Sequence, residues 1–158
     1  MEGSLSHEFQ TDLPATDVWE VYGSLVLGQL VPQLLPKVLA KVELLEGDGG
    51  VGTVLLVTFP RAETSEPGSY KEKFTMVDNE KYIKEAEVIE GGVLDLGFQK
   101  YVVRFEIIEQ EDGTTIIRST IEYKVDAEHT SNASLVSTGA LAGIAEAITK
   151  YIKEQKSL

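Results

Sequence analysis

Six segments in which apolar and polar residues alternate in steps of two follow one another between residues 38 and 125. These are VLAKVELLE, TVLLVTF, SYKEKFTMV, YIKEAEVIE, FQKYVVRFEIIE and TTIIRSTIEYKV, at residues 38–46, 53–59, 69–77, 82–90, 98–109 and 114–125. An alternation of period two places one row of side chains on each face of a β-strand. Turn-forming pairs separate the later strands, and Asp112-Gly113 is a strong hairpin signal. A polar loop is expected at residues 60–68. The pattern therefore predicts a run of consecutive antiparallel strands.

Helical and extended segments flank this run. Residues 5–13 alternate as another strand, which Pro14 ends. Two short helices are predicted next, one carrying Val18, Trp19 and Tyr22 and one at residues 25–36. From about residue 134 to 153, the apolar residues Leu141, Ile144, Ala145, Ile148 and Ile152 form a helical stripe. An antiparallel sheet would curl around this last helix to bury the stripe, which predicts a single α+β domain over residues 1–158.

The segment EGDGGVGT at residues 46–53 carries the G-x-G-x-x-G spacing of a dinucleotide-binding loop. Such a loop follows a strand and opens a helix, because the helix N-terminus supplies the N–H groups that hold a phosphate. Here the following segment is a strand rich in β-branched residues, and Thr53 stands where a P-loop needs lysine. We interpret these glycines as a hairpin turn.

Composition excludes several functions. With 14 basic and 26 acidic side chains, the net charge of −12 disfavours nucleic acids and anionic membranes as partners. The chain has no cysteine, and His7 and His129 lie far apart, so we expect neither a metal site nor a cofactor. It contains no apolar run of transmembrane length and no signal-peptide pattern, which favours a cytoplasmic protein. We expect a monomer or weak dimer.

One lysine shares a strand face with apolar side chains. Tyr82, Lys84, Ala86 and Val88 alternate onto one side of the segment 82–90, and the acidic residues take the other side. Burying an ammonium without a partner costs several kcal/mol, roughly. Three explanations are therefore open: Lys84 lies at a solvent-filled opening of the cavity, it pairs with a carboxylate, or it has a function that offsets the cost of its burial.

One carboxylate has a similar position on another strand. In residues 69–77, Tyr70, Glu72 and Phe74 share a face, so Glu72 is the natural partner for Lys84. The pattern fits an inward ion pair, two charges that reach solvent, or a pair of reactive groups.

Several motifs resemble one plant family. EGDGGVGT at 46–53, YKEKF at 70–74, VIEGGVLDLGF at 88–98 and STGALAGIAEAITKYI at 137–152 are similar to segments of the plant pathogenesis-related class ten proteins, the family of the major birch pollen allergen. The likeness covers essentially the whole chain and is greatest for the norcoclaurine synthase and norbelladine synthase branch. It implies a helix-grip fold, with a seven-stranded antiparallel sheet around a long C-terminal helix, two short helices and an internal apolar cavity.

The resemblance also implies roles for individual residues. In this branch, the lysine of the matching strand and the tyrosine and glutamate of YKEKF are acid-base and positioning groups, which correspond to Lys84, Tyr70 and Glu72. Norcoclaurine synthases place an aspartate where this chain has Val103, whereas norbelladine synthases carry an aliphatic residue there. Val103 therefore argues against transferring the norcoclaurine reaction whole.

Further side chains are expected to line the cavity. The alternation on three strands and the helix stripe select Phe74, Tyr82, Tyr101, Val103, Phe105 and Leu141 as ligand-binding residues.

Two functions are compatible with these residues. The first is an enzyme that condenses an arylethylamine, of the dopamine or tyramine type, with an aldehyde, to give an imine or a Pictet–Spengler product. Lys84 would protonate the carbonyl oxygen, and Glu72 would accept a proton. Lys84 could alternatively form its own Schiff base with the aldehyde. The second function is a carrier that binds a hydrophobic plant metabolite or phytohormone without transforming it.

Overall fold

The computed structural model describes residues 1–60 and 68–158. A polar loop was expected at residues 60–68, and its residues 61–67 lie outside the described part of the chain. One antiparallel sheet contains seven strands in the order β1-β7-β6-β5-β4-β3-β2. The strands are β1 (Glu2–Thr11), β2 (Lys41–Glu46), β3 (Val54–Thr58), β4 (Ser69–Asp78), β5 (Ile83–Gly91), β6 (Phe98–Glu109) and β7 (Thr115–Val125). Strands β2 to β7 pair in chain order and β1 pairs with β7, which confirms the antiparallel run predicted from the alternation.

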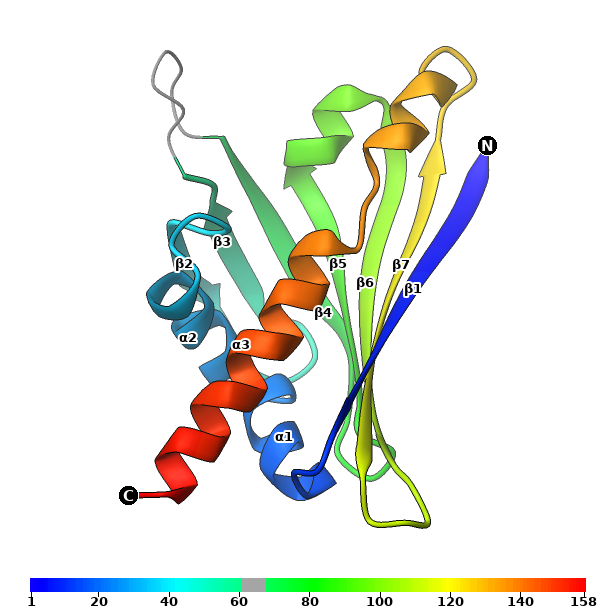
Figure 1. The fold of residues 1–158 in the computed structure, drawn as a ribbon. Helices are drawn as coiled ribbons and strands as arrows, with labels where there is room; N and C mark the ends of the chain where they lie inside the picture. Colours follow the sequence, from blue (N-terminus) through cyan, green and yellow to red (C-terminus); the bar gives the residue numbers. More distant parts are fainter. Residues whose placement is uncertain (61–67) are drawn as a thin grey trace.

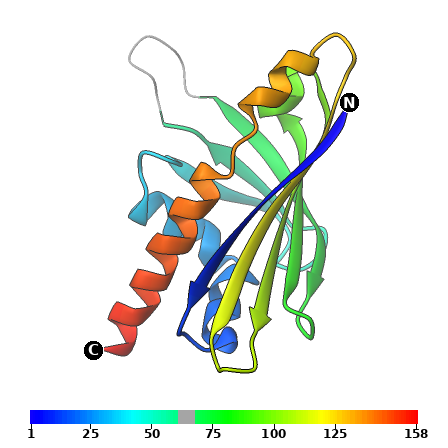
Figure 2. The same cartoon turned by 45° about the vertical axis from the view of Figure 1, so that its right-hand side comes forward.

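Three α-helices accompany the sheet: α1 (Ala15–Tyr22), α2 (Val26–Leu34) and α3 (Gly139–Lys156). Helix α3 crosses the concave face of the curved sheet (Figure 1), and the turned view shows the sheet curving around it (Figure 2). Its predicted stripe is buried at Ile144, Ala145, Ile148 and Ile152. The expected helix-grip fold is therefore confirmed.

The glycine-rich segment at residues 46–53 is a turn between paired strands. It joins β2 to β3, and Gly47, Gly49 and Gly52 have φ angles of 91°, 106° and 94°. These left-handed conformations are open to glycine and costly for other residues. Since a strand follows the turn, the interpretation as a hairpin is confirmed.

Element boundaries differ from the predicted ones in several places, and the first strand runs from Glu2 to Thr11 rather than over residues 5–13. Two 3-10 helices, η1 (Gly92–Leu96) and η2 (Thr130–Leu135), were not predicted. Helix α3 begins at Gly139 rather than near residue 134, because Val136 is extended and separates it from η2. Strand β2 begins at Lys41 rather than at residue 38, because the backbone at residues 38 and 39 still donates to the Leu35 carbonyl after α2.

A buried phenol on α1 offers a test of the core. Tyr22 is fully buried, its ring lies 5.1 Å from the Phe105 ring, and its oxygen has no hydrogen-bond partner in residues 1–60 and 68–158. Burial also raises the pKa of this phenol above its ordinary value. Tyr22→Phe removes a hydroxyl that lost its hydration without compensation, so it is expected to raise the free energy of unfolding by about 1 kcal/mol in urea denaturation.

Thr115→Val is a control of opposite sign. The Thr115 hydroxyl is buried and donates to the Leu13 carbonyl at 2.7 Å. Its loss leaves that carbonyl unpaired and should lower the free energy of unfolding by about 1–2 kcal/mol. A loss of stability of this size in Tyr22→Phe would contradict the assignment of an unpaired phenol.

Candidate active site

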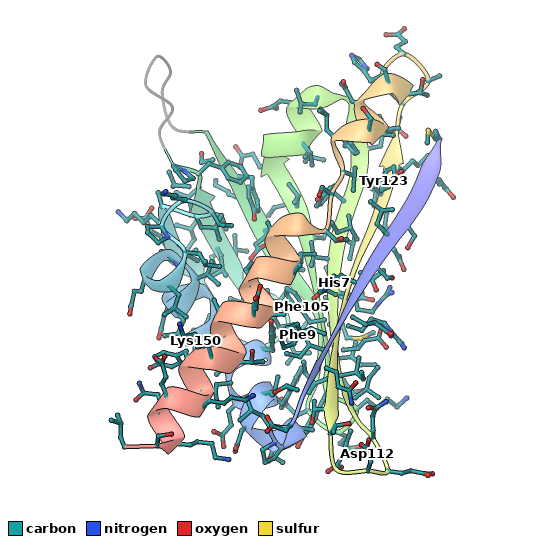
Figure 3. All side chains as sticks on the ribbon, in the orientation of Figure 1. His7, Phe9, Phe105, Asp112, Tyr123 and Lys150 are labelled. Carbon is teal, nitrogen blue, oxygen red and sulfur yellow. The ribbon has the colours of Figure 1, made fainter. Side chains whose placement is uncertain are left out.

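Lys84 points into the molecule. It lies in β5 opposite Val77 of β4 and Phe105 of β6, and only 3% of its surface is exposed. Ala86 and Val88, the next residues on the same face, are also buried. Phe105 lies between the sheet and α3 (Figure 3). The alternation therefore predicted the direction of the Lys84 side chain correctly.

The Lys84 amine borders an inner chamber of about 110 Å³ between the sheet, α2 and α3. The chamber brings together most of the predicted site residues, namely Tyr70, Glu72, Phe74, Lys84, Val103, Phe105 and Leu141. Its other walls include Leu27, Gly28 and Val31 of α2. Among the residues that line it, all within the described part of the chain, only Glu72 and Lys84 are charged.

A larger outer chamber adjoins the inner one. Its volume is about 530 Å³, and it contains the predicted ligand-binding residue Tyr101. The two chambers share Leu39, Tyr70, Val103, Leu141 and Ile144 as walls. Together they form the apolar space expected between the sheet and the long helix.

Two groups surround the Lys84 ammonium directly. Its Nζ atom donates to the backbone carbonyl of Ser24 at 3.4 Å. The same atom lies 4.5 Å from the centroid of the Phe74 ring, which is a cation–π distance. These contacts compensate part of the cost of burying a positive charge.

A direct ion pair between Lys84 and Glu72, one of the arrangements that the sequence left open, is not formed. Within the described residues, Lys84 makes no salt bridge, and Glu72 lies opposite Val88, four positions along β5 from Lys84. Four residues of a strand span roughly 13 Å. Both residues therefore line the inner chamber from neighbouring strands of the sheet, with their backbone positions offset along the strands.

Burial changes the proton affinity of both groups. It raises the pKa of Glu72 to about 7, although the Lys84 charge acts in the opposite direction. It lowers the pKa of Lys84 to about 8, although Glu72 again opposes the change. Desolvation outweighs the mutual attraction because each charge has left water. Near neutral pH, both groups can therefore give and take protons.

Tyr70 stands where the two chambers meet. Burial, followed by the nearby Glu72 charge, raises the pKa of its phenol well above the ordinary value, so the group stays protonated as a donor. Its ring lies 5.3 Å from the Phe59 ring. A Cβ atom at Gly92 would lie 2.9 Å from the Tyr70 Cβ, so the glycine allows this close approach.

Tyr82 does not line either chamber, in contrast to its assignment as a ligand-binding residue. Its φ angle is 57°, and β5 begins only at Ile83, so the alternation does not extend to it. Its ring stacks on Trp19 at 5.2 Å with an interplanar angle of 12°. Tyr82 therefore joins β5 to α1.

Several lining residues were missed by the sequence reasoning. The inner chamber uses Ser24 and Leu25, and the outer chamber uses Val93 and Leu96 of η1. The apolar stripe of the second predicted helix was a usable signal for Leu25, whereas Ser24, a polar residue before that helix, gave none. The η1 residues carry no period-two pattern that could have indicated them.

The described residues show no metal-binding cluster of three or more His, Asp or Glu side chains. Within this same part of the chain, no helix has both the length and the hydropathy that a membrane crossing requires.

A sheet that grips a long helix over an apolar tunnel, with an acid and a lysine inside, defines a small-molecule-binding protein of the helix-grip class. The chain belongs to the pathogenesis-related protein Bet v 1 family, whose model matches residues 1–155.

Two curated relatives and one solved structure are similar over nearly the whole chain. The chain is 48% identical to norbelladine synthase from Narcissus pseudonarcissus over 159 residues, which covers 99% of this chain and 96% of that protein. It is 41% identical to S-norcoclaurine synthase from Thalictrum flavum subsp. glaucum over 154 residues, or 97% of this chain and 72% of that protein. The structure of norcoclaurine synthase from Thalictrum flavum in complex with dopamine and hydroxybenzaldehyde superposes with a TM-score of 0.84 at 39% identity, covering 98% of this chain and 88% of that chain.

Proposed function

We propose that this protein condenses an arylethylamine of the dopamine or tyramine type with an aldehyde to form an imine. The observation that carries the proposal is the lining of the inner chamber, which brings together the buried Lys84, the carboxyl of Glu72 and the phenol of Tyr70. The similarity to norbelladine synthase over both full chains supports the same assignment. Apolar walls suit the aromatic rings of both substrates.

The reaction needs four proton transfers, and Glu72 and Lys84 can perform all of them. Glu72 accepts a proton from the substrate ammonium, and the freed amine attacks the aldehyde carbon, so that a C–N bond forms and the carbonyl electron pair moves to oxygen. Lys84 donates a proton to that oxygen. Nitrogen then loses its extra proton to the neutral Lys84, and the hydroxyl leaves as water after Glu72 returns to it the proton taken from the substrate ammonium, so both side chains end in their starting states. Both protons lost by nitrogen thus end in the water, and an iminium remains.

Val103 favours release of the imine over cyclisation. Closing a Pictet–Spengler ring requires a base that removes a proton from the aromatic ring. On β6 the chamber is lined by Val103 and Phe105, neither of which is an acid, so Glu72 would have to serve both steps. A cyclising reaction is the second candidate, because Glu72 has the raised proton affinity that such a base needs.

Incubation with dopamine or tyramine and hydroxybenzaldehyde tests the proposal. We expect imine formation faster than the buffer reaction, measured as the secondary amine trapped by cyanoborohydride. A single enantiomer of a tetrahydroisoquinoline, resolved by chiral chromatography, would instead establish cyclisation. Trapped product at the buffer rate, together with tight binding of an apolar ligand, would favour the carrier. The cytoplasmic location and the monomeric or weakly dimeric state stay predictions, which fractionation and light scattering would check.

A further inference from the structure

The corner between α1 and α2 provides the hydrogen-bond acceptor for Lys84. Gly23 and Ser24 separate the two helices, and the Ser24 carbonyl accepts a hydrogen bond from Lys84 Nζ at 3.4 Å. This carbonyl belongs to the short connection between Tyr22, the last residue of α1, and Val26, the first residue of α2. The position of the corner therefore decides where the ammonium is held.

The corner itself is fixed by the Ser24 side chain. Its hydroxyl donates to the Glu20 carbonyl at 2.6 Å and accepts from the Val26 backbone N–H at 3.2 Å. Both contacts are local, so they hold the shape of the corner but not its distance from the sheet.

Trp19 joins the corner to the strand that carries Lys84. A Cβ atom at Gly23 would overlap the Trp19 indole, with 2.6 Å to Cζ2, so the ring lies directly on the Gly23 backbone. The same indole stacks on Tyr82, two residues before Lys84, and its Nε1 donates to Asn79 Oδ1 at 3.0 Å. One rigid side chain thus contacts both the corner and the start of β5.

We infer that Trp19 and Gly23 are positioning residues for the condensation, because together they hold the Ser24 carbonyl against the Lys84 ammonium. The inference rests on the proposed function. An ammonium has three N–H donors. One is directed to Ser24 and the Phe74 ring covers another side, which leaves a donor for the substrate oxygen.

The other groups around Lys84 determine what its titration reports. Strand β4 presents the carboxyl of Glu72 and the phenol of Tyr70, whereas β6 and α3 present only apolar side chains to the chamber. The corner contributes a carbonyl that stabilises the charged amine. Displacing the corner therefore lowers the pKa of Lys84 while Glu72 and Tyr70 stay in place.

Gly23→Ala is the test, because the new methyl group must push the corner away from Trp19. We expect the Lys84 titration, followed by ¹⁵N NMR of Nζ and assigned by its loss in Lys84→Met, to move down by about half to one pH unit. The alkaline limb of kcat/KM should move with it, so that kcat/KM at pH 9 falls about threefold to tenfold while KM changes little. Gly143→Ala in α3, where a Cβ atom meets nothing within 4 Å, is the matched control and should change neither quantity.

Two further variants keep the test decisive. In Trp19→Phe/Gly23→Ala the shorter ring leaves room for the methyl group, so the Lys84 titration should return toward the wild-type value. If Gly23→Ala does not fold, Trp19→Phe alone should lower the Lys84 titration midpoint, because the corner loses its rigid contact. An unchanged Lys84 titration in a folded Gly23→Ala protein overturns the inference. If the wild-type protein forms no imine, the proposed function fails, and the Lys84 titration still decides whether the corner positions the amine.

Discussion

Lys84→Met is expected to lower kcat by about 100- to 1,000-fold, the range typical of losing a positioned general acid. Methionine has a similar length and no charge, so the walls of the chamber remain in contact with it and KM should change less than threefold, roughly. Because Lys84 is 3% exposed and makes no salt bridge within the described residues, its charge is costly to bury. The same substitution should therefore raise the free energy of unfolding by about 1–3 kcal/mol.

The opposite signs of the two effects make this prediction specific. If Lys84 had a structural role, its replacement would lower both the free energy of unfolding and kcat. If it is a catalytic group that is costly to bury, its replacement lowers kcat and raises the free energy of unfolding. Initial rates of trapped imine and urea denaturation measure the two effects on one protein preparation. Lys73→Met is the control, since this exposed lysine lies on the outer face of β4 and should affect neither. Wild-type kcat in Lys84→Met would exclude the ammonium as the acid.

The direction of the reactive side chains could be predicted from sequence because it depends on strand period alone. Lys84 and Glu72 each lie within a long strand with neighbours of clear polarity, so alternation places them correctly. Tyr82 shows where this reasoning stops. Its left-handed backbone lies just before β5 begins, and no period-two pattern reports a single positive φ angle.

The relation between the two charges could not be predicted in the same way. Their separation depends on the register of β4 against β5, which irregularities near residues 71–72 and 74–76 shift. Sequence alternation shows which face a residue occupies but not which residue lies opposite it. The separation between Lys84 and Glu72 could therefore be known only from the three-dimensional structure.

The hydrogen bond from Lys84 to the Ser24 carbonyl could also not be predicted from the sequence. Two separate short helices were predicted, the second from residue 25, and α1 does end before it, at Tyr22. A backbone acceptor has no residue-type signature, however, and its use by Lys84 depends on how α1 packs against the sheet at β6. The side chains proposed for catalysis could be picked out from the sequence, whereas the groups that contact them arise from tertiary packing.

Wild-type kcat/KM is expected to follow a narrow bell against pH, with an acid limb near 7 and an alkaline limb near 8. Glu72, whose pKa is raised to about 7, works as a base only when it is deprotonated, that is above this value. Lys84, whose pKa is lowered to about 8, works as an acid only when it is protonated, that is below this value. The product of the two fractions is greatest between the limbs. Rates of trapped imine between pH 5.5 and 9.5, approximately, would trace the curve.

Glu72→Gln should remove the acid limb and lower kcat by about 100-fold, since the amide cannot accept the substrate proton. It should also move the alkaline limb to lower pH, because the carboxylate that supports the Lys84 charge is gone. Glu90→Gln is the matched control, because Glu90 pairs with Lys71 at the surface and should leave both limbs in place. A Glu72→Gln enzyme whose alkaline limb stays at the wild-type position would show that the two groups do not interact within the chamber. The proton transfers proposed here would then need a different acid or base.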